Sequence, residues 1–237
     1  MSQPQTKEKV ELAVADGTRM AAYAATPEQS GPHPGLLLFQ EAFGVNHHIR
    51  HVADRFAREG YVVIAPELFH RTAPAGFEAG YTDFPAVMPH LQALTPPAIE
   101  DDVRAAYEWL RSNKNVDVNQ ISCVGFCVGG RVSFIANSIV TLRAAISFYG
   151  GGIAPGLLDR AVVQQAPLLL IWGGLDKHLP AEYRKAVNDA LTAQQKNFVN
   201  AEFSRADHGF FCDERAAYEP HSAKQAWALT SEFLRSS

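Results

Sequence analysis

Short apolar runs alternate along the chain with longer stretches of helical periodicity. Several runs are apolar without interruption, which is typical of parallel strands covered on both faces. The predicted strands cover residues 10–15, 20–26, 35–40, 61–65, 120–126, 143–149, 167–172 and 198–203. The predicted helices cover residues 47–58, 98–112, 131–137, 181–195 and 221–235. This alternation predicts an α/β fold, in which a mostly parallel central sheet carries helices on both faces.

Turn and capping residues mark several element boundaries. Asp16-Gly17 lies between the first two strands and predicts a hairpin turn. Asn46 can cap the helix that begins at residue 47, and Gly60 follows the end of that helix. The stretch 66–97 contains several prolines and histidines, so we expect an irregular surface loop or lid there. Since no repeat or linker divides the chain, we expect a single domain over residues 1–237, with residues 1–8 flexible.

Composition and charge narrow the classes of partner. The chain has 237 residues, of which 47% are hydrophobic and 19% charged, and its net charge is −4 with a pI near 6.1. The absence of a basic stripe argues against nucleic acid or an anionic membrane as a partner. The N-terminal residues are polar, unlike a signal peptide, and no apolar run approaches the ~18 residues that cross a bilayer. Three cysteines are a small, odd number, unlike a secreted disulfide framework, so we expect a cytoplasmic protein. We also expect it to be a monomer or homodimer.

The segment Gly125-Phe-Cys-Val-Gly-Gly130 carries the strongest chemical signal. It joins a predicted strand to a predicted helix, with Cys127 at the apex. This pattern is the nucleophile elbow G-x-S-x-G with cysteine in place of serine. A Cβ at Gly125 or Gly129 would obstruct the close packing of strand against helix. The alternative is an inert, buried cysteine in a glycine-rich connection.

Two further residues lie where the partners of an elbow nucleophile are needed. Asp176 follows one predicted strand, and His208 follows the last one. Parallel sheets gather functional groups at the carboxyl ends of their strands, and the order nucleophile, acid, histidine is that of α/β-hydrolases. In this arrangement His208 takes the thiol proton, Asp176 orients the imidazole, and the N–H groups of Val128 and Ala42 form the oxyanion hole. Taken singly, Asp176 could be a turn residue and His208 a solvated loop histidine.

Four segments form a recognisable pattern: Gln40-Glu-Ala-Phe-Gly-Val-Asn46, Ala65-Pro-Glu-Leu68, the cysteine elbow and Gly173-Gly-Leu-Asp176. Through these segments the chain resembles the dienelactone hydrolase family of α/β-hydrolases over nearly its whole length. It implies an ester or lactone hydrolase with a Cys127–Asp176–His208 triad. It also implies that Glu41 contacts the thiol in the resting enzyme, so that the thiolate forms only when substrate arrives. A simple loop salt bridge is the alternative for Glu41.

The chain departs from the family where arginines hold the carboxylate of dienelactone. Residues 72–97 contain no Arg or Lys, and Cys212 stands about where a second arginine is expected. Arg71 and Arg205 are nearby but at different positions; Arg71 could line the mouth of the pocket, and a solvated loop position is its alternative. We expect an apolar pocket that takes a less charged ester or lactone as readily as dienelactone. Its predicted aromatic lining is Phe77, Tyr81, Phe84, Phe210 and Phe211.

For several other candidate residues we expect a structural role. His47 and His51 have the i, i+4 spacing of zinc ligands, but no third ligand is evident, so we expect neither a metal nor another cofactor. Cys123 should pack as a small apolar residue, while the role of Cys212 stays open. Two functional alternatives remain: a broader carboxylesterase or thioesterase, and a non-catalytic thiol protein used for binding or redox sensing.

Overall fold

The computed structural model of the chain describes residues 5–237 and contains two compact units, Met1–Ser122 and Cys123–Ser237. The described strands are hydrogen-bonded in the order β1-β2-β4-β3-β5-β6-β7-β8, and helices alternate with them along the sequence. The α/β fold with a mostly parallel sheet is therefore confirmed. Each unit has its own internal packing, and the single domain expected from the sequence stays a prediction.

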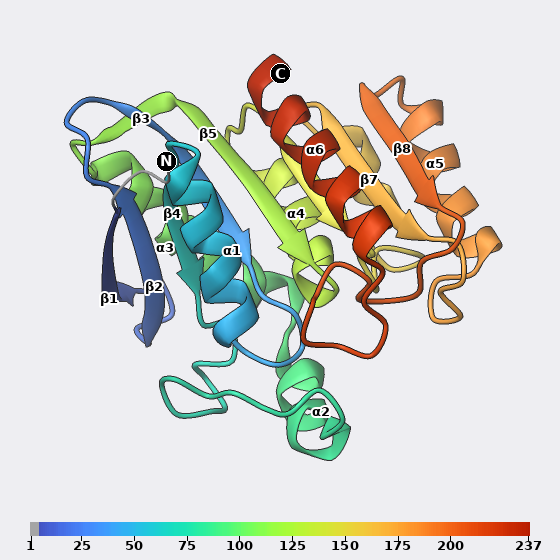
Figure 1. Cartoon of the computed structure of the whole chain (residues 1–237), viewed down its shortest axis with the longest axis horizontal. Coiled ribbons are helices and arrows are strands. Elements are labelled where there is room, and N and C mark those ends of the chain that lie inside the picture. The colour runs from blue at the N-terminus through green and yellow to red at the C-terminus, as the bar shows by residue number, and fades with distance from the viewer. Residues whose placement is uncertain (1–4) are drawn as a thin grey trace. The chain divides into compact units, whose positions relative to one another are not determined.

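The first unit contains four complete strands and the beginning of a fifth. The strands are β1 (Gln5–Ala13), β2 (Arg19–Pro27), β3 (His33–Phe39), β4 (Val62–Pro66) and β5 (Val116–Phe126), and the helices are α1 (His47–Arg58), α2 (Phe84–Ala93) and α3 (Pro96–Ser112). β1 pairs with β2 and β2 with β4 in antiparallel register, whereas β3 and β4 are parallel. α1 and α3 pack on opposite faces of these strands (Figure 1).

The second unit contains only parallel strand pairs. It holds the end of β5, then β6 (Ala145–Phe148), β7 (Leu168–Gly173) and β8 (Phe198–Phe203), with helices α4 (Val128–Ile139), α5 (Ala181–Ala193) and α6 (Pro220–Ser236) and the short 3-10 helix η1 (Leu158–Val163). Phe126, Phe148, Ile171 and Ala201 stand opposite one another across the four strands. α6 covers one face of these strands, and α4 covers the other (Figure 1). β5 and β6 end at this row and β7 and β8 end two residues beyond it, so loops that follow different strands leave from one edge.

Local sequence signals placed several elements correctly. α1 has the predicted bounds, and the side chain of Asn46 accepts a hydrogen bond from the Ile49 N–H at 3.2 Å. Gly60 follows the end of this helix with φ +99°, a left-handed conformation that glycine adopts without steric cost. β4 and β7 are buried along their whole length, as their continuous apolar runs predict.

The expectation of an irregular stretch over residues 66–97 was wrong in part, because this stretch contains α2. Asp83 caps α2 by accepting a hydrogen bond from the Ala86 N–H at 3.2 Å, and Val87 is fully buried. Pro89 lies inside the helix and lacks an N–H, so the local sequence disfavours a helix here. Packing stabilises the helix in spite of this. Residues 5–8, expected to be flexible, form the first part of β1 and pair with β2; residues 1–4 lie outside the described residues.

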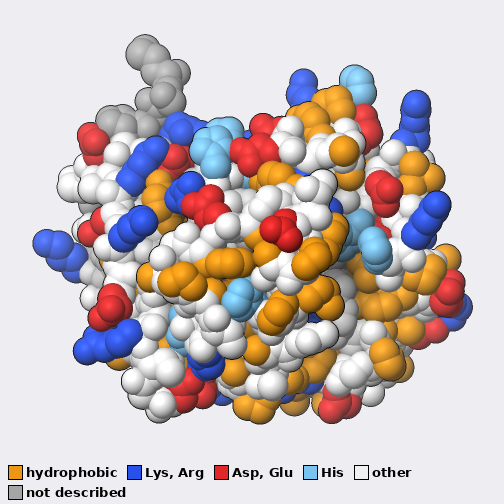
Figure 2. All heavy atoms as spheres, turned by 90° about the horizontal axis from the view of Figure 1, so that it is seen from below, with side chains coloured by type: hydrophobic (Ala, Val, Ile, Leu, Met, Phe, Trp, Pro, Cys, Tyr) orange, Lys and Arg blue, Asp and Glu red, His pale blue; other side chains and the backbone are white. Residues whose placement is uncertain are grey.

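The surface mixes apolar and charged side chains. Phe84 and Met88 of α2 are 50% and 42% exposed, the largest exposed apolar side chains of that helix. On the face shown in Figure 2, hydrophobic side chains (orange) lie between basic and acidic ones. None of the described helices has both the length and the hydropathy to span a membrane.

Candidate active site

Cys127 lies at a sharp turn between β5 and α4. Its backbone has φ 57° and ψ −118°, whereas a non-glycine residue rarely has a positive φ. Its N–H donates to the Phe148 carbonyl at 3.0 Å, which ties the turn to the end of β6. Such a strained conformation costs roughly 1–3 kcal/mol and persists only when the surroundings enforce it. The thiol is consequently presented at the edge where the strands end.

Two glycines make this turn possible. A Cβ at Gly125 would lie 1.9 Å from the Gly129 carbonyl oxygen, and a Cβ at Gly130 would lie 2.7 Å from the Phe148 carbonyl oxygen. Backbone atoms cannot yield to a side chain at such distances, so both positions exclude any other residue. As expected, a side chain at Gly125 would collide with the helix backbone. On the helix itself, Gly130 is a position where a side chain would collide with the end of β6.

Cys127, His208 and Asp176 form a continuous chain of contacts within the second unit. His208 Nε2 lies 3.2 Å from Cys127 Sγ, and His208 Nδ1 lies 2.7 Å from Asp176 Oδ2. The three residues follow β5, β8 and β7, so they meet because these parallel strands have their carboxyl ends at one edge. The structure thus brings together the three residues that the sequence singled out.

Asp176 is held by its own loop. Its Oδ1 accepts hydrogen bonds from the N–H groups of His178 and Leu179, at 2.8 and 3.2 Å. Burial alone would raise the pKa of this carboxyl, but the hydrogen bond and charge of His208, together with these N–H groups, lower it below its ordinary value. Asp176 is therefore a fixed carboxylate that can orient the imidazole.

His208 has the electrostatics of a strong base. Burial disfavours the imidazolium, but the charge of a Cys127 thiolate and the Asp176 carboxylate outweigh it and raise the pKa of His208 to about 10. The ring of Tyr149 packs against the imidazole at 5.0 Å between centroids, and the ring of His178 lies edge-on at 5.6 Å. His208 is thus positioned and charged to hold a proton beside the sulfur.

Glu41 and Ala42 belong to the first unit. Both are buried, and the Glu41 carbonyl accepts a hydrogen bond from Gln40 Nε2 at 3.2 Å. Gln40 Oε1 in turn accepts from the Leu68 N–H at 3.0 Å, which ties this segment to the residues after β4. Their proposed roles, in thiol activation and in the oxyanion hole, remain proposals.

The comparisons with known proteins identify the family of the chain. The model of the dienelactone hydrolase family matches residues 20–237. The chain belongs to this family. A relative in Synechocystis sp., named "Putative carboxymethylenebutenolidase", is 36% identical over 92% of this chain and 92% of its own length. A relative of the same name in Escherichia coli is 34% identical over 92% of this chain and 83% of its own.

A solved structure supports the assignment to this family. The crystal structure of a "Putative Dienelactone Hydrolase" from Klebsiella pneumoniae has a TM-score of 0.90 and 29% identity, and the alignment covers 99% of this chain and 100% of that one. This dienelactone hydrolase family member therefore has the α/β-hydrolase fold and is a hydrolase.

The predicted aromatic lining divides into two groups. Phe210 and Phe211 are buried in the second unit, where Phe211 packs against Phe126 at 5.1 Å and Phe148 at 5.0 Å between centroids. Their contacts are those of core residues. The three others pack around Phe43 or its neighbours in the first unit: Phe77, Tyr81 and Phe84. Of these aromatic candidates, Phe84 is the one with a half-exposed ring.

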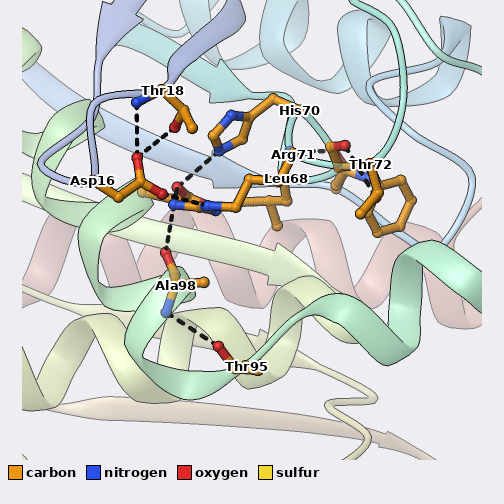
Figure 3. A network of polar contacts seen from close by, with 11 residues as sticks. Asp16, Thr18, Leu68, His70, Arg71, Thr72, Thr95 and Ala98 are labelled. Atoms are coloured by element: carbon orange, nitrogen blue, oxygen red, sulfur yellow. Dashed lines mark hydrogen bonds and ion pairs between the residues drawn. The ribbon is translucent and has the colours of Figure 1, made fainter.

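Arg71 contacts protein carboxylates, as Figure 3 shows. Its Nη1 and Nη2 lie 2.9 and 2.8 Å from the two oxygens of Asp102, and its Nε donates to Asp16 at 2.6 Å. Asp102 is fully buried and also lies 3.0 Å from His70 Nε2. The guanidinium thus links the β1–β2 turn to α3 within the first unit. These contacts account for Arg71 without a substrate.

The other histidines and cysteines that the sequence analysis considered have the contacts and burial of structural residues. The rings of His47 and His51 are stacked at 6.2 Å, and no group of three or more possible metal ligands occurs among residues 5–237. Cys123 is buried, and burial raises its pKa to about 12. Cys212 is buried as well.

Sequence reasoning did not single out Arg131. It lies on the first turn of α4, and its charge interacts with that of Cys127.

The pairing of Arg71 predicts a structural phenotype. Arg71→Met leaves the Asp102 carboxylate buried without its cation, and breaking such a pair costs about 3 kcal/mol when the removed partner is partly exposed. Urea denaturation should show this loss of unfolding free energy, whereas Asp16→Asn, which changes the more exposed partner, should cost much less. An Arg71→Met variant with wild-type stability but a raised KM for esters would instead support the substrate role.

Proposed function

We propose that this dienelactone hydrolase family member cleaves a carboxylic ester or lactone through a thioester on Cys127. The observation that carries the proposal is the chain of contacts from Cys127 through His208 to Asp176, which starts at a strained strand-to-helix turn. A merely structural cysteine needs neither a histidine at its sulfur nor a carboxylate behind that histidine. The names of the relatives, which refer to a butenolide-cleaving enzyme, support an ester or lactone as substrate.

Acylation begins at the sulfur. The Cys127 thiolate attacks the carbonyl carbon, and the electron pair of the C=O bond moves to the oxygen. When the tetrahedral intermediate collapses, the C–O bond to the leaving group breaks and His208 gives its proton to the departing oxygen. Asp176 keeps the imidazole in the orientation that this transfer requires. For a lactone, the leaving hydroxyl stays attached to the acyl group.

Deacylation reverses the proton flow. Neutral His208 takes a proton from water, the resulting hydroxide attacks the thioester carbonyl, and the C–S bond breaks to regenerate the thiolate. The oxyanion in both steps needs N–H donors, and we assign one to Val128, the first residue of α4, whose N–H has no partner within the helix. We assign the second to Ala42. No step requires a metal or an organic cofactor.

The resting state of the thiol has two possible forms. The family resemblance implies that Glu41 keeps the thiol protonated until substrate arrives. The contact of His208 Nε2 with Cys127 Sγ at 3.2 Å, and of His208 Nδ1 with Asp176 at 2.7 Å, supports a different proposal, in which His208 already holds the thiol proton and the two residues form an ion pair. The cytoplasmic location and the monomeric or dimeric state predicted from the sequence stay predictions.

Replacing the nucleophile tests the function directly. Cys127→Ala should lower kcat for p-nitrophenyl acetate by ~10⁴–10⁶, the usual effect of losing a triad member. Cys123→Ala is the matched control, since it removes a buried thiol of the same unit, and its turnover should stay near wild type. Equal turnover by wild type and Cys127→Ala would refute the nucleophile. A wild-type protein that hydrolyses no ester would favour the thiol-sensing alternative.

Alkylation by iodoacetamide separates the two resting states. In an ion pair the imidazolium is lost only as pH rises through about 10, so the alkylation rate of the wild type should be fast and nearly flat from pH 7 to 9. His208→Gln removes the proton acceptor, so its alkylation rate should be at least ~10-fold lower than that of the wild type at pH 7.

Glu41→Gln provides the complementary control. Under the ion-pair proposal its alkylation profile matches that of the wild type. Slow alkylation of the wild type that accelerates when an ester analogue binds, with turnover lost in Glu41→Gln, would instead support the mechanism implied by the family resemblance.

A further inference from the structure

The residue that follows β6 is strained in the same way as Cys127. Tyr149 has a φ of 36°, although a non-glycine residue rarely has a positive φ. Its N–H donates to the Ile171 carbonyl of β7 at 2.7 Å, and its side chain is fully buried. Strain of this kind persists only where the surroundings enforce it, and it concentrates at functional sites. The conformation of Tyr149 therefore calls for an explanation.

The loop that begins at Tyr149 is fixed on two sides. Gly150 packs backbone to backbone against Gly130 on the first turn of α4, since a Cβ at Gly130 would lie 2.7 Å from the Cα of Gly150. The hydroxyl of Tyr183 on α5 donates to the Gly150 carbonyl at 2.8 Å and accepts from the Ile153 N–H at 2.7 Å. The loop is thus attached to the helix that begins at the cysteine, and Tyr149 has no freedom to relax.

This packing places the ring of Tyr149 against the imidazole of His208. The ring centroids are 5.0 Å apart and the ring planes are inclined by 58°. The same phenol ring contacts Phe210 at 5.7 Å and Phe126 at 6.3 Å between centroids, and both of these side chains are buried. Because a close-packed interior leaves a ring little room to move, the imidazole lies on a rigid aromatic surface.

The imidazole has several titratable neighbours in the second unit. Cys127 contacts its Nε2 and Asp176 its Nδ1, the backbone N–H of His208 donates to Asp207 Oδ1 at 2.7 Å, and the ring of His178 lies edge-on at 5.6 Å. Burial lowers the pKa of His208, whereas Cys127 and Asp176 raise it. An aromatic ring also attracts a cation that lies within ~6 Å of its centroid. The ring of Tyr149 is within that range and favours the imidazolium without carrying a charge.

We propose that Tyr149 is a positioning residue, which holds the imidazole of His208 between Cys127 and Asp176 and favours its protonated form. The inference rests on the proposed function, in which His208 carries the thiol proton. Once the sulfur has attacked the carbonyl carbon, its negative charge has moved to the oxyanion, so the imidazolium loses its nearest counter-charge. Asp176 and the ring of Tyr149 then keep the proton on His208 until the leaving oxygen takes it.

An NMR titration of His208 measures this effect without any ester chemistry. It uses Cys127→Ala as the parent protein, because this variant has no sulfur whose charge could act on the imidazole. On this parent, Tyr149→Leu should lower the pKa of His208 by ~0.5–1, since the imidazolium loses the ring. Tyr149→Phe keeps a ring and removes only the hydroxyl, so the pKa of His208 should stay near that of the parent.

Two comparisons separate the effect of the ring from a general effect on packing. Phe211→Leu removes a buried ring that packs on Phe126 and Phe148, and the pKa of His208 should not move. Pentafluorophenylalanine in place of Tyr149 keeps the shape of a phenyl ring but reverses its quadrupole, so the pKa should fall below that of Tyr149→Phe, even if Tyr149→Leu does not fold. An unchanged or raised pKa with pentafluorophenylalanine, or an equal fall in Phe211→Leu, would overturn the inference.

Ester kinetics with the native thiol keep this inference separate from the proposed function. Because the ring acts through His208, Tyr149→Leu should lower kcat for p-nitrophenyl acetate by ~10–100-fold, the usual effect of a misplaced catalytic group, and leave KM within a few fold. Tyr149→Phe should restore most of the loss. A raised KM with unchanged kcat would overturn the positioning role. If the wild type cleaves no ester, the proposed function fails, while the titration of His208 still decides on Tyr149.

Discussion

The backbone conformation of Cys127 is the constraint on which the candidate active site depends. The cysteine has a positive φ because β5 and α4 pack so closely that the Cα of Gly125 faces the Gly129 carbonyl. This strain points the sulfur out of the turn, at the edge where the parallel strands end. There the imidazole of His208 and the carboxylate of Asp176 arrive from neighbouring loops. A relaxed turn would leave the same three residues present but not in contact.

Sequence reasoning was most successful where local chemistry determines the structure. The bounds of α1 follow from Asn46 as its cap and from Gly60 after its end. The order of Cys127, Asp176 and His208 could be interpreted because parallel strands place their carboxyl ends together, so topology converts positions far apart in sequence into neighbours. These inferences needed a rule about one turn, one cap or one sheet edge, and such rules hold without knowledge of the packing.

Features that depend on tertiary partners could not be predicted. α2 contains Pro89, and its helical form depends on the burial of Val87, which no local pattern reveals. Arg71 looked available to a substrate because its partners, Asp16 and Asp102, are distant in sequence. The surroundings of Arg131 could not be predicted either, because they depend on packing that leaves its buried Nε without a hydrogen-bond partner among residues 5–237.

The central claim is that catalysis proceeds through a thioester on Cys127, and mass spectrometry of the acylated protein tests it most directly. Quenching the wild type in acid within the first turnover, after rapid mixing with excess p-nitrophenyl acetate, should trap the intermediate. The account predicts one acetyl group per chain, located on the peptide that contains Cys127 and removed by hydroxylamine. An acetyl group on any other residue, or turnover by the wild type with no acyl-enzyme at any time point, would contradict it.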